Sequence, residues 1–145
     1  MTMADAEKRA LRLEISAMDR ETLVLDAAEV AAPGAAGRFV VLPGHAPMLA
    51  SLDTGVVRVL TAAGETRLFA VNGGIVHVLE GGMLLLTRSV EEGAEIDLPR
   101  AREALGRAEA RLAARAEGTD LPRAQAARAR ARARIGAAAR PPAGA

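Results

Sequence analysis

Apolar and polar residues alternate along the first two thirds of the chain, a pattern typical of strands with one buried face. Leu11, Leu13 and Ile15 are each followed by a polar residue, and neighbouring side chains of a strand point to opposite faces. Further short β-prone segments follow at residues 23–25, 29–31, 39–42, 55–60, 66–71, 75–79 and 83–87. Turn-forming sequences separate them, at residues 33–34, 72–74 and 80–82. The pattern predicts an antiparallel β-sandwich or flattened barrel.

The period of the apolar residues changes to a helical one at Ile96. One stripe recurs at steps of three and four along the next segment, formed by Leu98, Ala101, Leu105, Ala108 and Leu112. Pro99 fits only the first turn of a helix, and Asp97 is placed to cap the exposed N–H groups there. A first helix is therefore predicted to begin near Pro99.

A second helix is predicted after residues 118–120, which read Gly-Thr-Asp and precede Pro122. Residues 127–134 alternate alanine with arginine; both are strong helix formers, and β-branched residues are missing from the run. At about 100° per residue, a narrow stripe of mostly small residues forms one face: Leu121, Ala124, Ala127, Ala131 and Ile135.

Together these segments predict an α+β protein in which an N-terminal antiparallel β-sandwich is followed by a C-terminal α-helical hairpin. We expect the sandwich in residues 1–90, the hairpin in residues 91–138 and a disordered tail in residues 139–145. The helical stripes are thin, so at ~25 cal/mol per Å² of buried apolar surface the hairpin should be only marginally stable alone. We therefore expect it to be able to detach or extend when a partner offers more contact.

The distribution of charge also separates the chain into two parts. The net charge is +1, but six arginines and no acid after residue 120 give +6, which leaves −5 for the rest of the chain. Different partners are expected for the two parts. Residues 1–10 do not resemble a signal peptide, and no apolar run is long enough to span a membrane.

No arrangement of residues typical of an active site is present. The only histidines are His45 and His77, and the chain has no cysteine. His77 lies between Val76 and Val78, whose expected burial would point His77 to the opposite, outer face. No carboxylate pair is spaced with a histidine as metal ligands are. The sequence predicts a non-catalytic protein that has no metal site and requires no cofactor.

A rigid loop follows the strand at residues 39–42. Residues 42–49 read Leu-Pro-Gly-His-Ala-Pro-Met-Leu, and two prolines so close together cannot continue a sheet or a helix. This run closely resembles the epsilon subunit of the F-type rotary ATP synthase. Matching motifs follow in the expected order at residues 55–58, 69–75 and 96–101, so the resemblance covers roughly residues 11–135.

The resemblance implies a contact surface for the gamma subunit and the c-subunit ring. The residues that would form it are Arg38, Pro43, Gly44, His45, Ala46 and Pro47. The reading from the residues alone is that the His45 ring caps local backbone groups. At the position of Arg38, family members commonly carry an acidic or small polar residue, so the charge pairing with the ring would differ here.

The arginine-rich second helix has three interpretations. It could be a solvated surface, as most charge runs are, or it could bind nucleic acid. Against nucleic acid, aromatic residues make up 1% of the chain and offer no stacking platform. The resemblance implies the third, contact with an acidic segment of the catalytic beta subunit, through Arg123, Arg128, Arg130, Arg132 and Arg134. We favour this third interpretation.

Residues 96–101 also resemble a motif with which some epsilon subunits bind regulatory ATP in the folded hairpin. The motif residues are Ile96, Asp97, Arg100 and Ala101, and Arg107 lies on the same helix face as Arg100, so both arginines could meet phosphates. The alternative is that Asp97 is only a helix cap and Arg100 a surface residue. Which arginines of the second helix would join them stays open, because the alternating run matches in more than one register.

The function expected from the resemblance is that of a non-catalytic rotor subunit in the central stalk. The sandwich would couple ring rotation to the catalytic head of a proton-translocating ATP synthase, and the hairpin would inhibit ATP hydrolysis. The chain would be peripheral, on the cytoplasmic face of the bacterial inner membrane, and would reach the membrane only through the complex. The alternative is a stand-alone ATP-sensing or nucleic-acid-binding module.

Overall fold

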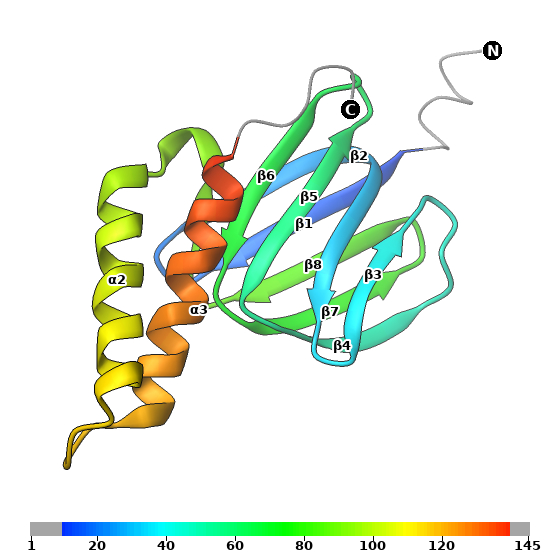
Figure 1. Ribbon diagram of the computed structural model, residues 1–145. Helices are drawn as coiled ribbons and strands as arrows, with labels where there is room; N and C mark the ends of the chain where they lie inside the picture. Colours follow the sequence, from blue (N-terminus) through cyan, green and yellow to red (C-terminus); the bar gives the residue numbers. More distant parts are fainter. Residues whose placement is uncertain (1–9, 140–145) are drawn as a thin grey trace.

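The computed structural model describes residues 10–139 and contains a sandwich of strands followed by two helices (Figure 1). The strands are β1 (Leu11–Ala17), β2 (Arg20–Gly34), β3 (Gly37–Val41), β4 (Met48–Leu52), β5 (Gly55–Thr61), β6 (Thr66–Val71), β7 (Gly74–Leu79), β8 (Gly82–Thr87) and β9 (Val90–Glu92). A short 3-10 helix, η1 (Gly93–Glu95), leads to α2 (Leu98–Ala114) and α3 (Leu121–Ala138). The α+β prediction is confirmed.

The two layers of the sandwich share the long strand β2. One layer runs β1-β8-β7-β4, and the other contains β3, β2, β5, β6 and β9. The first half of β2 pairs with β1, and its second half pairs with β3 and β5 after a bulge between Ala27 and Glu29. The two short strands expected at residues 23–25 and 29–31 are therefore one bent strand, because the bulge bends β2 without ending it.

Inward-facing residues of both layers form one core, as the alternation predicts. Its fully buried side chains are Phe69, Leu11, Leu13, Ile15, Met83, Leu85, Val30, Val41, Val57, Val59, Val76 and Val78. His77 is exposed between Val76 and Val78, so its predicted orientation is confirmed. Strand β4 was not predicted, because its alternation of half-buried, exposed and buried positions is only five residues long.

The turn predicted at Pro33 and Gly34 is wrong. Both residues belong to β2 and pair with Arg38 and Gly37, and the chain reverses at residues 35–36. Pro33 is tolerated because the pairing of β2 with β5 has already ended, so no ladder bond requires its missing N–H. Gly34 is needed for close packing: an added Cβ would lie 2.7 Å from the carbonyl oxygen of Gly37.

Both helices begin where their caps predict. The side chains of Asp97 and Asp120 each accept a hydrogen bond of 3.1 Å from the backbone N–H three residues later, and a proline occupies the first turn of each helix. Helix α3 lies between α2 and the sandwich (Figure 1). No helix among residues 10–139 is long and apolar enough to cross a membrane.

Helix α3 buries two faces, one more than its predicted stripe. Ala124 and Ala131 belong to that stripe and are buried, whereas Leu121 is 38% exposed. Ala133 and Ala137, which the stripe left out, are buried against the sheet together with Ala70. Because α3 is packed between α2 and the sandwich, it needs small residues on both sides.

Candidate functional site

The hairpin is docked on the sandwich through small side chains near the C-terminal end of α3. Ala133 and Ala137 pack against Ala70, with Val56, Leu68 and Ile96 half-buried around them. Two glycines allow the backbones to approach. A Cβ on Gly93 would lie 2.0 Å from the carbonyl oxygen of Ala137, and one on Gly136 would lie 3.0 Å from the Val56 side chain. The docked hairpin therefore depends on a close fit rather than on a large apolar area.

Charged side chains hold the β9–η1 linker between the sandwich and α3. Arg67 of β6 donates two hydrogen bonds, of 2.7 and 2.8 Å, to the Glu92 carboxylate. Arg134 of α3 forms an ion pair with Glu91: its Nε lies 2.9 Å from Oε1, and its Nη2 donates a 3.4 Å bond to Oε2. The buried Nε–H of Arg134 does not point at Oε1 and forms no hydrogen bond, so the 3.4 Å contact from Nη2 is the only hydrogen bond of this ion pair. Neighbouring carboxylates of β9 thus face different elements.

The Arg67–Glu92 pair makes part of the stability depend on pH. The hydrogen bond from Arg67 lowers the pKa of Glu92, and burial opposes this lowering. The same hydrogen bond raises the pKa of Arg67. Because the folded-state pKa of Glu92 is depressed, its contribution is fully present above the unfolded value of 4.5 and is lost as the pH falls through the folded value.

We expect Glu92→Gln to lower the free energy of unfolding by up to about 1 kcal/mol at neutral pH. The difference from the parent protein should shrink as the pH falls below 4.5. Urea unfolding over a pH series measures it. Glu14→Gln is the control, because Glu14 pairs with an exposed Arg12 and should matter little. An equal difference at every pH would show that the charge of Glu92 is not responsible.

An arginine-lined cleft of about 270 Å³ lies between the hairpin and the sandwich. Its charged lining consists of Arg107 and Arg111 from α2, Arg130 and Arg134 from α3, and Glu91 from β9. Asn72 and Ser89 add polar groups from the sandwich. Four guanidinium groups against one carboxylate make this cleft suited to a polyanion, since planar guanidinium groups bind phosphates with paired hydrogen bonds.

Only one of the five residues predicted for ATP binding lines this cleft, namely Arg107. Asp97 caps α2, as the alternative interpretation predicted, and Arg100 is exposed beside it. Ile96 packs beneath α3, and Ala101 is buried. Arg111, Glu91 and the sandwich residues of the cleft were not predicted, because they come together only when the hairpin docks.

The structure divides the arginines of α3 between two sides. Arg130 and Arg134 line the cleft, whereas Arg128 and Arg132 line a groove on the other side of the helix. Arg123 is exposed in the first turn, where its backbone N–H donates to the Asp120 carboxylate. The helical geometry thus places Arg130 and Arg134 on one side of α3 and Arg128 and Arg132 on the other.

The proline loop lies on the side of the sandwich away from the hairpin (Figure 1). His45 donates its backbone N–H to the Leu42 carbonyl at 3.0 Å, and its ring Nδ1 lies 2.6 Å from the Ala46 carbonyl oxygen. The ring therefore contacts the local backbone, as the reading from the residues alone expected. Arg38 does not join this loop: its Nη1 donates to the Val56 carbonyl at 2.9 Å.

An exposed apolar face covers the outside of β4, β7 and β8. Leu49 is 71% exposed, and Ile75, Leu79 and Leu86 are each more than 40% exposed. Ile75 pairs with Leu86, and His77 pairs with Leu49, so these residues are neighbours across the strands. This face was not predicted, although Ile75 and Leu79 occupy outward positions of an alternating strand, where polar residues are usual.

No group of histidine, cysteine or acidic residues that could hold a metal ion occurs in the described part of the chain. The described residues form an arginine-lined cleft, an exposed apolar sheet face and a hairpin held by a small joint.

Comparison with known proteins places both parts of the chain. Residues 10–93 match the family described as the ATP synthase delta/epsilon chain, beta-sandwich domain, and residues 94–139 match its long alpha-helix domain. The chain is 43% identical over 102 residues to ATP synthase epsilon chain 1 of Syntrophotalea carbinolica, covering 70% of this chain and 73% of that one. It is 41% identical over 103 residues to the epsilon chain of Synechococcus elongatus, covering 71% and 74%.

A chain in the cryo-EM structure of the Euglena gracilis mitochondrial ATP synthase, containing OSCP, F1 and the c-ring, shares the fold. Its TM-score is 0.73 at 22% identity, covering 90% of this chain and 81% of that one. The sandwich, the hairpin and the sequence matches agree, and the chain belongs to the epsilon-chain family of ATP synthase subunits.

Proposed function

We propose that this epsilon chain is a non-catalytic subunit of the central stalk of a proton-translocating ATP synthase. Its sandwich would link the gamma subunit to the c ring, and its hairpin would restrain ATP hydrolysis. The observation that carries this proposal is the construction in two parts: a well-packed sandwich with an exposed apolar face, and a hairpin held by a small joint. The chain would be peripheral, on the cytoplasmic face of the bacterial inner membrane.

The apolar face of β4, β7 and β8 is the surface best suited to the gamma subunit. An exposed patch of large apolar side chains on a soluble domain marks an interaction site. The proline loop, with Pro43, Gly44, His45, Ala46 and Pro47, follows β3 and leads into β4, so it lies next to this face and would meet the ring. Arg38 would contribute at the edge, although it also donates to Val56.

We expect the double variant Leu49→Asp with Ile75→Asp to abolish assembly. Each substitution would place a charge in an interface from which water is excluded on binding. Both side chains are exposed in the free chain, so the sandwich should still fold. Co-purification with gamma measures assembly, and thermal unfolding checks the fold. The control is Leu121→Asp, the same change at an exposed apolar residue of the hairpin. Normal assembly of the double variant would show that this face does not bind the gamma subunit.

The hairpin is proposed to act as a conformational brake. In the docked form, Arg130 and Arg134 line the cleft, whereas Arg123 is exposed and Arg128 and Arg132 line the other side of α3. Undocking would free all five for an acidic segment of the catalytic beta subunit. The joint is small enough for such an exchange, since it buries mostly alanine.

Regulatory ATP is proposed as a ligand of the arginine-lined cleft. The cleft offers four guanidinium groups from two helices, and a bound triphosphate would bridge α2 and α3. Binding there would favour the docked hairpin, because a ligand stabilises the conformation that holds its site together. Arg107, predicted from the helix face that it shares with Arg100, is the one predicted ATP-site residue that lines the cleft. Asp97 and Arg100 lie at the start of α2 and would act only at its edge.

Nucleic acid is not part of this proposal. The arginines of α3 are divided between opposite sides of the helix, so they do not form one stripe along a surface. Phe69 is fully buried and Phe39 half-buried, so neither provides an exposed ring on which bases stack.

A further inference from the structure

The single asparagine of the chain lies in the turn between β6 and β7. Asn72 is followed directly by Gly73 and Gly74, and it lines the arginine-lined cleft from the side of the sandwich. Its backbone N–H donates to the Thr87 hydroxyl at 3.0 Å and to the Ser89 carbonyl at 3.3 Å. The backbone of Asn72 is therefore held in a turn beneath the hairpin.

An asparagine that precedes a glycine can react with the peptide unit that follows it. The backbone nitrogen of the glycine attacks the side-chain amide carbon, Cγ, and closes a five-membered succinimide ring. The new N–C bond replaces the bond to the amide nitrogen, which takes up the proton of the attacking N–H and leaves as ammonia. Water then opens the ring at one of its two carbonyls and leaves an aspartate or an isoaspartate. Glycine favours this reaction because no side chain hinders its nitrogen.

The nitrogen of Gly73 is free to attack. No hydrogen bond within residues 10–139 uses the Gly73 N–H, and the pairing of β7 with its neighbours begins only at Gly74. The surroundings are also uncrowded: for an added Cβ on Gly73, the nearest atoms would be the Leu52 carbonyl oxygen at 3.6 Å and the Thr54 hydroxyl at 3.9 Å. The attacking nitrogen therefore breaks no hydrogen bond when it moves toward the side chain.

The side-chain amide of Asn72 is activated by a neighbouring hydroxyl. Thr54 donates a 3.2 Å hydrogen bond to the amide oxygen, Oδ1. This bond stabilises the negative charge that develops on the oxygen when the nitrogen attacks Cγ. The amide nitrogen, Nδ2, has no hydrogen-bond partner within residues 10–139 and is not buried, so no contact retains the departing ammonia.

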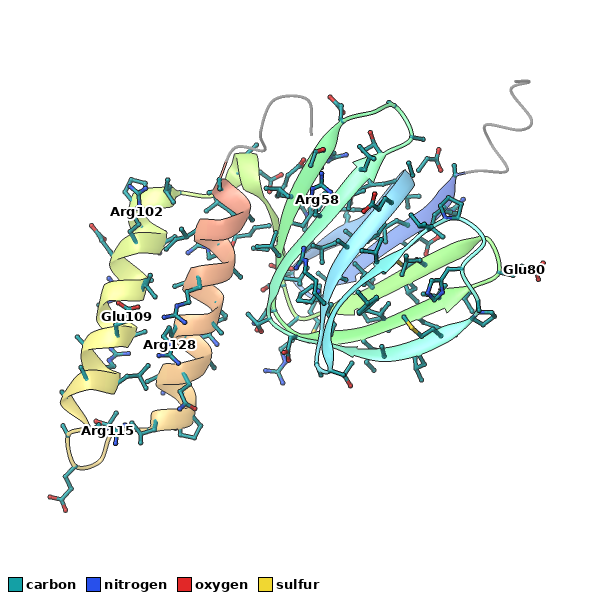
Figure 2. All side chains as sticks on the ribbon, turned by 45° about the vertical axis from the view of Figure 1, so that its right-hand side comes forward. Arg58, Glu80, Arg102, Glu109, Arg115 and Arg128 are labelled. Carbon is teal, nitrogen blue, oxygen red and sulfur yellow. The ribbon has the colours of Figure 1, made fainter. Side chains whose placement is uncertain are left out.

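We propose that Asn72 is a self-modification site. In the folded protein it deamidates through a succinimide formed with Gly73, and Thr54 is the hydrogen-bond donor to the reacting carbonyl. Water reaches the ring for the second step, because Asn72 is only half-buried and the hairpin diverges from the sandwich toward its tip (Figure 2). The reaction needs no enzyme and no cofactor, and it leaves a new carboxylate in the arginine-lined cleft.

The new carboxylate changes the charge of the cleft. Glu91 is the one carboxylate among the described lining residues, and it already pairs with Arg134. A second carboxylate at position 72 competes with phosphates for the other guanidinium groups, so a modified chain should bind ATP more weakly. This consequence rests on the regulatory ATP proposed above, whereas the reaction itself does not.

The test follows the intact mass of the full chain during incubation at physiological temperature and neutral pH. We expect the mass to rise by the difference between an amide and an acid, and proteolytic mapping to find both aspartate and isoaspartate at position 72. Asn72→Ser is the control and should keep its mass. Thr54→Val is expected to slow the reaction about two- to tenfold, the effect of losing one hydrogen bond, and Thr54→Ser should restore the rate. Thermal unfolding checks that each variant is folded.

Three results would overturn the proposal. The first is a native chain that keeps its mass while the urea-unfolded chain reacts, because the fold would then protect Asn72. The second is aspartate without isoaspartate, which would indicate direct hydrolysis of the amide. The third is an unchanged rate in folded Thr54→Val, which would show that the hydroxyl does not assist.

The consequence for the cleft is measured separately, by titration of Asn72→Asp with ATP. We expect weaker binding than in the parent protein, and equal affinity would show that the new carboxylate does not compete with the phosphates. If the parent protein does not bind ATP, the proposal of regulatory ATP is wrong, whereas the mass measurement still decides whether Asn72 is modified.

Discussion

Replacing Gly93 with alanine is expected to displace the hairpin from the sandwich while both remain folded. The new Cβ would lie 2.0 Å from the carbonyl oxygen and 2.9 Å from the carbonyl carbon of Ala137. Both atoms are backbone, so no side-chain rotation relieves the clash. Gly93 does not have a positive φ, so alanine is not strained at this position itself. The least costly response is movement of α3 away from the sheet, because the joint buries only small side chains.

The chain contains no cysteine, so two introduced cysteines can be labelled specifically. Labels at Glu80→Cys in the sandwich and Glu117→Cys near the hairpin tip report the distance between the two parts by electron–electron double resonance (Figure 2 labels Glu80). We expect a longer and broader distance distribution in Gly93→Ala. The matched control is Gly106→Ala, where a Cβ meets nothing within 4 Å; it should stabilise α2 by up to about 1 kcal/mol. An unchanged distribution in Gly93→Ala would show that Gly93 does not determine docking.

Replacing Arg107 or Arg130 with alanine is expected to weaken ATP binding by about ten- to a hundredfold. Each arginine would give a charge-assisted contact to the triphosphate of roughly 1.5–3 kcal/mol. The two come from different helices but line one cleft. Titration of the full chain with ATP measures the affinity. The same titration with AMP tests whether binding depends on the triphosphate.

Arg123→Ala is the control for the loss of charge, because Arg123 is exposed and outside the cleft. An equal loss of affinity in this variant would indicate attraction by net charge alone. If the unchanged protein does not bind ATP, the proposal of regulatory ATP is wrong, whereas the proposed role in the central stalk is unaffected.

Features fixed by neighbouring residues could be predicted from the sequence. Asp97 and Asp120 with their following prolines define the helix starts, because a cap acts within one turn. The predicted turn at Pro33 and Gly34 was wrong because both residues lie inside β2, where they pair with β3. Local turn preference does not reveal that Gly34 must make room for the Phe39 ring.

The candidate site was predictable only in part. Arg107 was predicted because it lies on the same helix face as Arg100. The choice of Arg130 and Arg134 over Arg128 and Arg132, however, depends on which alanines of α3 meet the sheet. An alanine can pack equally well against α2 or against the sheet. The alternating sequence therefore does not indicate which arginines of α3 line the cleft. Glu91 joins them from β9, and a contact between residues so far apart in the sequence requires the tertiary structure.

The brake itself is tested most directly by ATP hydrolysis in the assembled synthase. The comparison is between the full chain and a chain that ends after Gly93, which keeps β9 paired with β6 and retains the Arg67–Glu92 bonds. We expect faster hydrolysis with the shortened chain, with assembly and coupled synthesis intact. Unchanged hydrolysis in a correctly assembled complex, at every ATP concentration, would contradict it.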